Sequence, residues 1–126
     1  MRYLKNKSFQ KKLKENDLDD EDVKNVLNDI FKGRAAPLGS KLYKIRGAKD
    51  GRGKSGGFRS LFFWKKDERI IFCWLFAKNE QDNLSPDEDK ALKILCKEYD
   101  GLTGDEIRQS IERNNLMEIQ YDKQSS

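Results

Sequence analysis

Basic side chains gather in one stretch of the sequence, residues 41–66, in types and at spacings suited to binding phosphate. This stretch holds nine Lys or Arg residues and one acid, Asp50, for a net charge of +8, whereas the whole chain carries +4. A basic patch on a mildly acidic body is typical of a protein that binds a polyanion. The nine basic residues are Lys41, Lys44, Arg46, Lys49, Arg52, Lys54, Arg59, Lys65 and Lys66.

Five of these cations fall on the predicted strands 41–46 and 57–65, and strand geometry gives the directions of their side chains. Side chains alternate between the two faces of a sheet, and a strand over 41–46 therefore places Lys44 and Arg46 on one face. The next predicted strand is largely aromatic, and Arg59 lies near its beginning. One interpretation is an arginine that stacks on Phe or Tyr and supports packing. The other is a rigidly held guanidinium that binds phosphate through its bidentate fork.

The apolar runs over 57–65 and 69–77 are predicted to form an antiparallel hairpin, because a short polar turn separates them. In the expected register Arg59 lies near Leu75, although a slip of one residue would exchange the faces. The C-terminal end of this hairpin then approaches its glycine-rich beginning. The basic residues expected to converge there are Lys54, Arg59 and Lys78, flanked by Lys44 and Arg46.

The sequence Gly53-Lys54-Ser55 is similar to the end of a nucleotide-binding phosphate loop, but its surroundings do not fit that motif. The motif requires a glycine five residues before Gly53, where this chain has Ala48, and a helix afterwards, where this chain enters a strand. A nucleotide-hydrolysing loop is therefore excluded. The glycines still allow a nucleic-acid backbone to come close, and Lys49, Arg52 and Lys54 supply charge.

The chain has few residues that could bind a metal ion or take part in redox reactions. The chain has no histidine, and its two cysteines, Cys73 and Cys96, lie far apart within apolar patterns. We predict buried free thiols, with a disulfide as the alternative. The acidic run over 17–22 is interpreted as the start of a helix with Asp19 as its N-cap, because anions favour that end of a helix. We expect neither a metal nor a cofactor.

Hydrophobic periodicity and capping residues predict the elements that must position these cations. The predicted helices run over 8–15, from the Asp19 cap to Gly33, from Pro86 to Asp100, and from the Thr103 cap to Asn114. The predicted strands are 41–46, 57–65, 69–77 and 117–121, with 1–4 as a short edge strand and 35–40 as a loop. This order indicates an α+β fold.

Length and composition limit the possibilities further. With 126 residues the chain is expected to form one domain, and its 13 aromatic residues provide bulk for a core. The longest apolar run, over 70–77, has the length of a strand and is far short of the roughly 20 residues of a membrane span. The first residues lead into charge rather than into an apolar signal segment, so a cytoplasmic location is expected.

Three segments resemble the RelE/HigB toxins of bacterial type II toxin–antitoxin systems, and in particular their HigB-like branch. They are Tyr43-Lys44-Ile45-Arg46, Gly53-Lys54-Ser55-Gly56-Gly57-Phe58-Arg59, and Phe76-Ala77-Lys78-Asn79-Glu80 followed by Asp82-Asn83. The resemblance covers about residues 20–100. It implies one RelE/HigB-like toxin domain over 1–126, with an antiparallel sheet of three to five strands, an N-terminal helical hairpin and C-terminal helices.

The resemblance also implies an activity, which is metal-free cleavage of mRNA on the ribosome. The RNA 2′-hydroxyl would attack the adjacent phosphate and leave 2′,3′-cyclic phosphate and 5′-hydroxyl ends. Arg59 would stabilise the phosphorane and Lys78 would bind phosphate, whereas Lys44 or Lys54 would be the base, since neighbouring cations favour a neutral amine. RNA-binding roles would fall to Lys41, Arg46, Lys49, Arg52 and Asn79.

The implied partners are mRNA, the ribosome and a cognate antitoxin. The antitoxin is commonly a helix-turn-helix protein similar to HigA. The toxin would contact operator DNA only through this antitoxin. No membrane partner is expected. The sequence departs from the family at three positions. RelE has arginine at the position of Asn79 and tyrosine at that of Ser85, and the HigB-like branch usually has arginine at that of Gln81. With no histidine, the general acid is unassigned.

Two alternatives stay open beside the nuclease. One is a binding protein of the same fold without catalysis, such as a degenerate toxin or an inhibitor of DNA gyrase similar to ParE. The other is a general nucleic-acid-binding domain in which Phe58, Phe62 and Trp64 would stack on bases.

Overall fold

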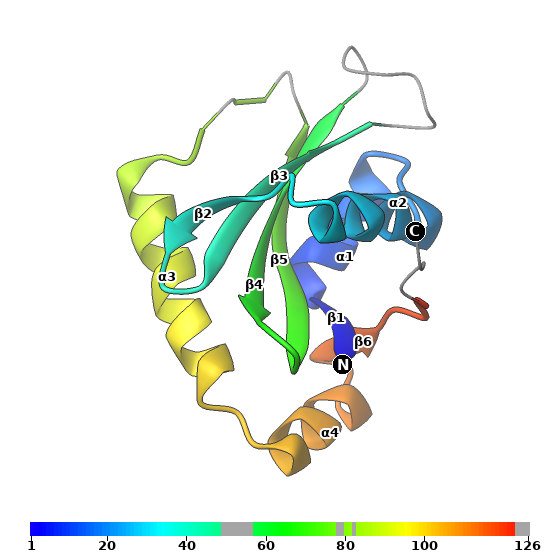
Figure 1. Cartoon of the computed structure of the whole chain (residues 1–126), viewed down its shortest axis with the longest axis vertical. Helices are drawn as coiled ribbons and strands as arrows, with labels where there is room; N and C mark the ends of the chain where they lie inside the picture. Colours follow the sequence, from blue (N-terminus) through cyan, green and yellow to red (C-terminus); the bar gives the residue numbers. More distant parts are fainter. Residues whose placement is uncertain (49–56, 78–79, 82, 123–126) are drawn as a thin grey trace.

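A computed structural model describes residues 1–48, 57–77, 80–81 and 83–122 of the chain. In this part a six-stranded mixed sheet is covered by two helices on each face (Figure 1). The strand order is β2-β3-β4-β5-β1-β6. The strands are β1 (Arg2–Asn6), β2 (Ala36–Gly39), β3 (Leu42–Gly47), β4 (Phe58–Lys65), β5 (Arg69–Ala77) and β6 (Leu116–Glu118).

The α+β class is confirmed, but the predicted sheet of three to five antiparallel strands is wrong in two respects. First, β1 pairs in parallel with β5, and it lies inside the sheet because β6 pairs with its other side. Second, the segment expected to be a loop contains β2, which pairs with β3 at the edge of the sheet. An edge position tolerates Pro37, which has no backbone N–H to donate.

The helices begin where their capping residues predict. Asp19 accepts hydrogen bonds from the backbone of Glu21 and Asp22, and Ser85 and Thr103 each cap their helix in the same way. The first helix starts slightly earlier than predicted, because Asn6 is its N-cap. The helices are α1 (Lys7–Glu15), α2 (Asp20–Phe31), α3 (Pro86–Asp100) and α4 (Gly104–Glu112). None of the described helices is both long and apolar enough to cross a membrane.

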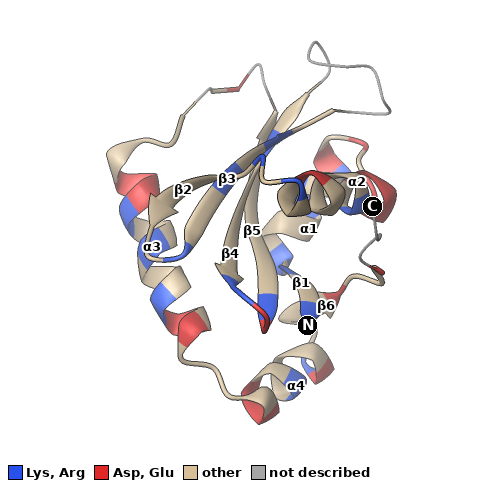
Figure 2. Cartoon of the chain, in the orientation of Figure 1, with Lys and Arg blue, Asp and Glu red and all other residues tan. Residues whose placement is uncertain are grey.

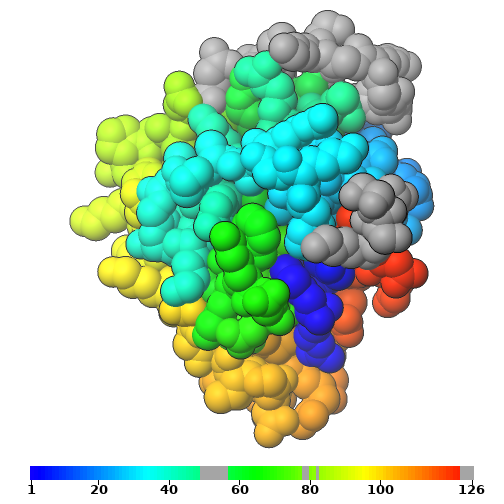
Figure 3. Space-filling model, viewed as in Figure 1, coloured from blue at the N-terminus to red at the C-terminus, as the bar shows by residue number. Residues whose placement is uncertain are grey.

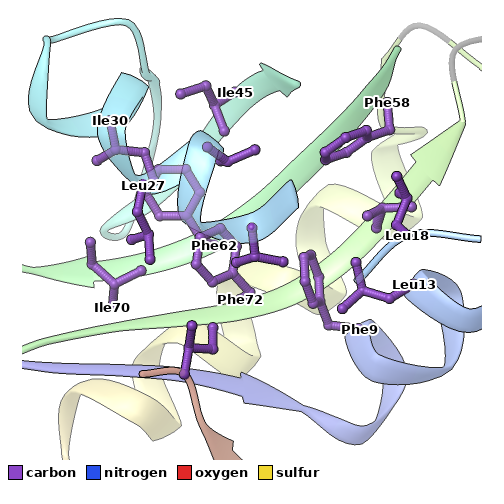
Figure 4. Packing of buried hydrophobic residues seen from close by; sticks show 14 residues of the cluster. Phe9, Leu13, Leu18, Leu27, Ile30, Ile45, Phe58, Phe62, Ile70 and Phe72 are labelled. Atoms are coloured by element: carbon purple, nitrogen blue, oxygen red, sulfur yellow. The ribbon is translucent and has the colours of Figure 1, made fainter. Parts of the chain in front are cut away.

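Each face of the sheet has its own apolar cluster. On one face α1 and α2 contribute Phe9, Leu27 and Ile30, which pack with Phe62 and Phe72 of the central strands (Figure 4). On the other face α3 and α4 cover a second cluster that includes both cysteines. The prediction of free, buried thiols is confirmed for Cys73 and Cys96. Phe62 belongs to the first cluster, so the core uses an aromatic residue that the alternative of a general nucleic-acid-binding domain assigned to base stacking.

A β-bulge changes the register between β4 and β5. Leu61 pairs with Trp74, whereas Phe62 pairs with Phe72, so Cys73 is an extra residue on β5. Arg59 therefore pairs with Phe76, one residue beyond the Leu75 of the predicted register. The predicted register differs because a regular hairpin register cannot anticipate an inserted residue.

The helix α3 is fixed to the sheet near its C-terminal end. The Arg69 guanidinium donates to the backbone oxygen of Leu102 at 2.8 Å, and Asn6 Nδ2 donates to the Tyr99 hydroxyl at 3.0 Å. Burial raises the pKa of Tyr99 to about 12, so its phenol stays neutral at physiological pH. These contacts hold α3 over the face of the sheet that carries the basic residues described below.

Candidate functional site

Two arginines stand directly opposite each other on the central strands. Arg46 of β3 pairs with Arg59 of β4, which in turn pairs with Phe76 of β5. On the same face, Lys44 pairs with Leu61 in the next row. Arg59 is only 6% exposed, whereas Arg46 is exposed at the surface. The strands therefore place a buried and an exposed arginine at directly paired positions.

These side chains line a groove of about 500 Å³ at the end of the sheet. Figure 2 shows the basic segments of β3 and β4 close together there, and Figure 3 shows how β2 and β3 cross this side of the molecule between α2 and α3. Four of the lining side chains are cationic and none is a carboxylate, among the residues that the structure describes. The lining residues are Arg34, Ala36, Lys44, Ile45, Arg46, Arg59 and Asn83.

The charge arrangement of the groove favours a bound anion. Four cationic side chains around one groove attract an anion. A phosphate there can accept charge-assisted hydrogen bonds from planar guanidinium groups. The groove is therefore chemically suited to a phosphodiester.

Two groove residues were not identified from the sequence. Asn83 accepts a hydrogen bond through Oδ1 from Lys44 Nζ at 2.9 Å, which fixes the lysine's ammonium group at the wall of the groove. Arg34 follows the end of α2 and forms an ion pair with Asp29 at 2.8 Å. Asn83 belongs to the third family-like segment, which was the only signal for it. Nothing in the spacing around Arg34 indicates a site.

A second set of contacts anchors the end of β5. Glu80 Oε1 accepts a hydrogen bond from the backbone N–H of Ala77 at 3.0 Å, and its Oε2 lies 3.3 Å from Lys12 Nζ of α1. The ammonium group of Lys12 also lies 5.3 Å from the ring centre of Trp74. The backbone hydrogen bond, with help from Lys12, holds the pKa of Glu80 below its ordinary value. Glu80 thus connects the end of β5 to Lys12 of α1.

Replacing Glu80 with glutamine is expected to lower the melting temperature slightly at pH 7 and to have a smaller effect at pH 3. Because the folded-state pKa of Glu80 is lowered, its contribution is present above the ordinary value of 4.5 and is lost as the pH falls through the folded-state value. Thermal unfolding of both proteins from pH 3 to pH 7 measures the difference. Glu112→Gln, at an exposed carboxylate on α4, is the matched control. A difference that persists unchanged at pH 3 would contradict this assignment.

The structure brings together three of the residues predicted from the sequence, Lys44, Arg46 and Arg59. It does not bring Lys41 to them, because Lys41 lies beyond the other end of β3 and forms an ion pair with Asp100 at 3.3 Å. Five predicted residues lie outside the described part of the chain: Lys49, Arg52, Lys54, Lys78 and Asn79. The last described pair of these strands, Gly47 with Phe58, adjoins the arginine pair.

The described groove residues limit the chemistry that they can perform. Arginine does not release its proton in proteins, so among the described lining residues only Lys44 can take part in proton transfer. In the same described part, no group of three or more His, Cys, Asp or Glu side chains could hold a metal ion. The arrangement can therefore bind phosphate, stabilise charge that develops on it, and move a proton at one lysine.

A comparison with known protein families identifies the family of this chain. The family described as RelE toxin of the RelE / RelB toxin-antitoxin system matches residues 1–119. The chain belongs to the RelE toxin family. The match includes every described residue of the groove, and RelE toxins are generally endoribonucleases that act with a cognate antitoxin. A search of curated proteins finds no match to this chain.

Proposed function

We propose that this RelE-family protein is a ribosome-dependent mRNA endoribonuclease, a toxin of the HigB-like branch that a helix-turn-helix antitoxin inhibits. The observation that carries the proposal is the buried Arg59, which pairs with Arg46 on the neighbouring strand, in a groove lined by four cationic side chains. Both arginines stand on central strands, which position a reacting group more precisely than loops do. A ribosomal substrate would place the protein in the cytoplasm.

The reaction is an internal transfer at one phosphate. The 2′-hydroxyl oxygen bonds to the adjacent phosphorus and loses its proton, and the bond from phosphorus to the 5′ oxygen of the next nucleotide breaks. That oxygen takes up a proton, so the products carry a 2′,3′-cyclic phosphate and a 5′-hydroxyl. Negative charge grows on the phosphorane oxygens, and Arg59 is the group assigned to stabilise it. Arg46, exposed at the rim, binds the neighbouring backbone.

Proton transfer in this proposal involves Lys44, whose ammonium group the Asn83 side chain holds in place. Lys54 is the second candidate for the base, and Lys78 is assigned to the scissile or neighbouring phosphate. Lys49, Arg52 and Asn79 stay proposed RNA-binding residues. Lys41 is not assigned to RNA binding in this proposal. It lies beyond the opposite end of β3, where it forms an ion pair with Asp100.

The small set of catalytic groups explains why the ribosome is needed. A site with few proton-transfer groups depends on a substrate held in the reactive geometry, and such positioning can contribute about 7–11 kcal/mol to lowering a barrier. The ribosome supplies an mRNA whose backbone is already ordered and bent. Free RNA in solution has to lose that freedom on the toxin alone.

Expression without the antitoxin tests the proposed function. Induction in a bacterial host is expected to arrest growth and to produce mRNA cuts within codons, and the uninduced culture is the control. A parallel assay of DNA supercoiling tests the gyrase alternative. Inhibition of supercoiling together with intact mRNA would replace the nuclease proposal by that alternative, and normal growth with intact mRNA would reject both.

A further inference from the structure

A second hollow adjoins the cationic groove on the side of α3. It measures about 290 Å³, and Lys44 and Asn83 line both spaces. Since these two residues are hydrogen-bonded to each other, they form the boundary between the groove and the hollow. A polymer whose phosphate lies in the groove therefore has a neighbouring unit within reach of the hollow. The residues lining the hollow are Leu38, Lys44, Asn83, Leu84, Ser85, Pro86 and Asp89.

The chemistry of the hollow differs from that of the groove. Its apolar lining comes from Leu38 of β2, Leu84 and Pro86, and the first two are half-buried side chains that pack against the second core cluster. Pockets for small organic ligands combine apolar walls with a few fixed polar groups in this way. A nucleobase has two apolar faces and a polar edge, and it matches such a pocket better than a second phosphate does.

Asp89 supplies the fixed polar group at the α3 side of the hollow. An ion pair at 2.9 Å joins its Oδ2 to Lys93 one turn further along the helix, and 35% of the aspartate side chain is exposed. The ion pair and the helix restrict where the carboxylate can lie. An ionised carboxylate accepts hydrogen bonds and donates none. It therefore favours a base with an exocyclic amino group over uracil, whose N3–H donor is flanked by two carbonyl oxygens that the carboxylate repels.

We infer that this hollow binds the base next to the phosphate held in the groove, and that Asp89 determines its preference for amino-bearing bases. The inference rests on the proposed function, because it assumes an RNA backbone in the groove. It assigns substrate selection to residues 83–89 and β2, apart from the strands that carry the arginines. Asp89 is a specificity residue and takes no part in the transfer at phosphorus.

Binding of RNA that cannot be cleaved tests the inference separately from catalysis. The probes are short oligoribonucleotides without the 2′-hydroxyl at the cleavage position, each with adenine, cytosine, guanine or uracil at one site in turn. At one position, amino-bearing bases are expected to bind about tenfold more tightly than uracil. Asp89→Asn should remove most of that difference, because the amide also donates. Asp87→Asn, an exposed aspartate in the same helical turn outside the hollow, should preserve it.

Mapping of cleaved codons on ribosomes is the second measurement, and it compares the same two variants. An unchanged codon preference in Asp89→Asn would overturn the inference while leaving the nuclease proposal intact. So would equal binding of all four bases at every position. Base-selective binding that depends on Asp89, without cleavage of ribosome-bound mRNA, would support base binding in the hollow and reject the proposed nuclease activity. Melting temperatures confirm that both variants are folded.

Discussion

Replacing Arg59 with lysine is expected to slow RNA cleavage by about 100- to 1,000-fold, which is the usual effect of losing a group that stabilises charge in a transition state. Lysine keeps the positive charge but lacks the planar fork that holds two phosphate oxygens at once. Arg59 is nearly buried between two paired strands, so an ammonium on a flexible stem cannot take the same place. Single-turnover cleavage of mRNA on programmed ribosomes measures the rate.

The matched control for this prediction is Arg46→Lys, the same change at the paired but exposed position. Its charge stays at the rim of the groove, and we expect its rate to fall by less than about tenfold, since exposed charges contribute little each. The melting temperatures of both variants are measured alongside. Equal losses of activity at the two positions would mean that burial of Arg59 has no special role in catalysis.

Replacing Phe72 with alanine is expected to lower the free energy of unfolding by about 3–5 kcal/mol. Phe72 is fully buried in the first core cluster, where its ring centre lies 5.1 Å from that of Phe9 and 5.4 Å from that of Phe62. Truncation removes both ring contacts and leaves a cavity between α1 and the sheet. Urea unfolding at constant pH measures the change.

Ile94→Ala is the control for the core prediction. Ile94 lies on the outer side of α3 with 53% of its surface exposed, so its truncation should change stability by no more than about 0.5 kcal/mol. Similar small losses at both positions would contradict the packing around Phe72. The predictions for Phe72 and Arg59 also separate folding from chemistry. Phe72→Ala is expected to lower stability, whereas Arg59→Lys is expected to lower the rate of cleavage.

Local signals in the sequence were sufficient for the helices and for the faces of the central strands. Asp19, Ser85 and Thr103 predict helix starts because the capping contacts involve residues only two or three positions away. Strand alternation likewise places Lys44 and Arg46 on one face, and the structure brings both to one groove with Arg59.

Features that depend on pairing between distant parts of the chain could not be predicted from local sequence signals. The parallel pairing of β1 with β5 joins residues near the N-terminus to residues near the middle of the chain. The bulge at Cys73 has no distinctive residue type, since Cys73 continues an apolar run. Lys41 has the same composition signal as Lys44, and only the packing of α3 shows that Asp100 holds it away from the groove.

The central claim is that the groove around Arg59 cleaves mRNA by internal transfer at one phosphate. Mapping both ends of each cut, with purified ribosomes, purified toxin and a defined mRNA, tests this claim most directly. Cuts are expected within the codon in the ribosomal A site, with 2′,3′-cyclic phosphate on one fragment and 5′-hydroxyl on the other. No cuts are expected when ribosomes are omitted. Intact mRNA, or fragments with 5′-phosphate ends, would contradict the claim.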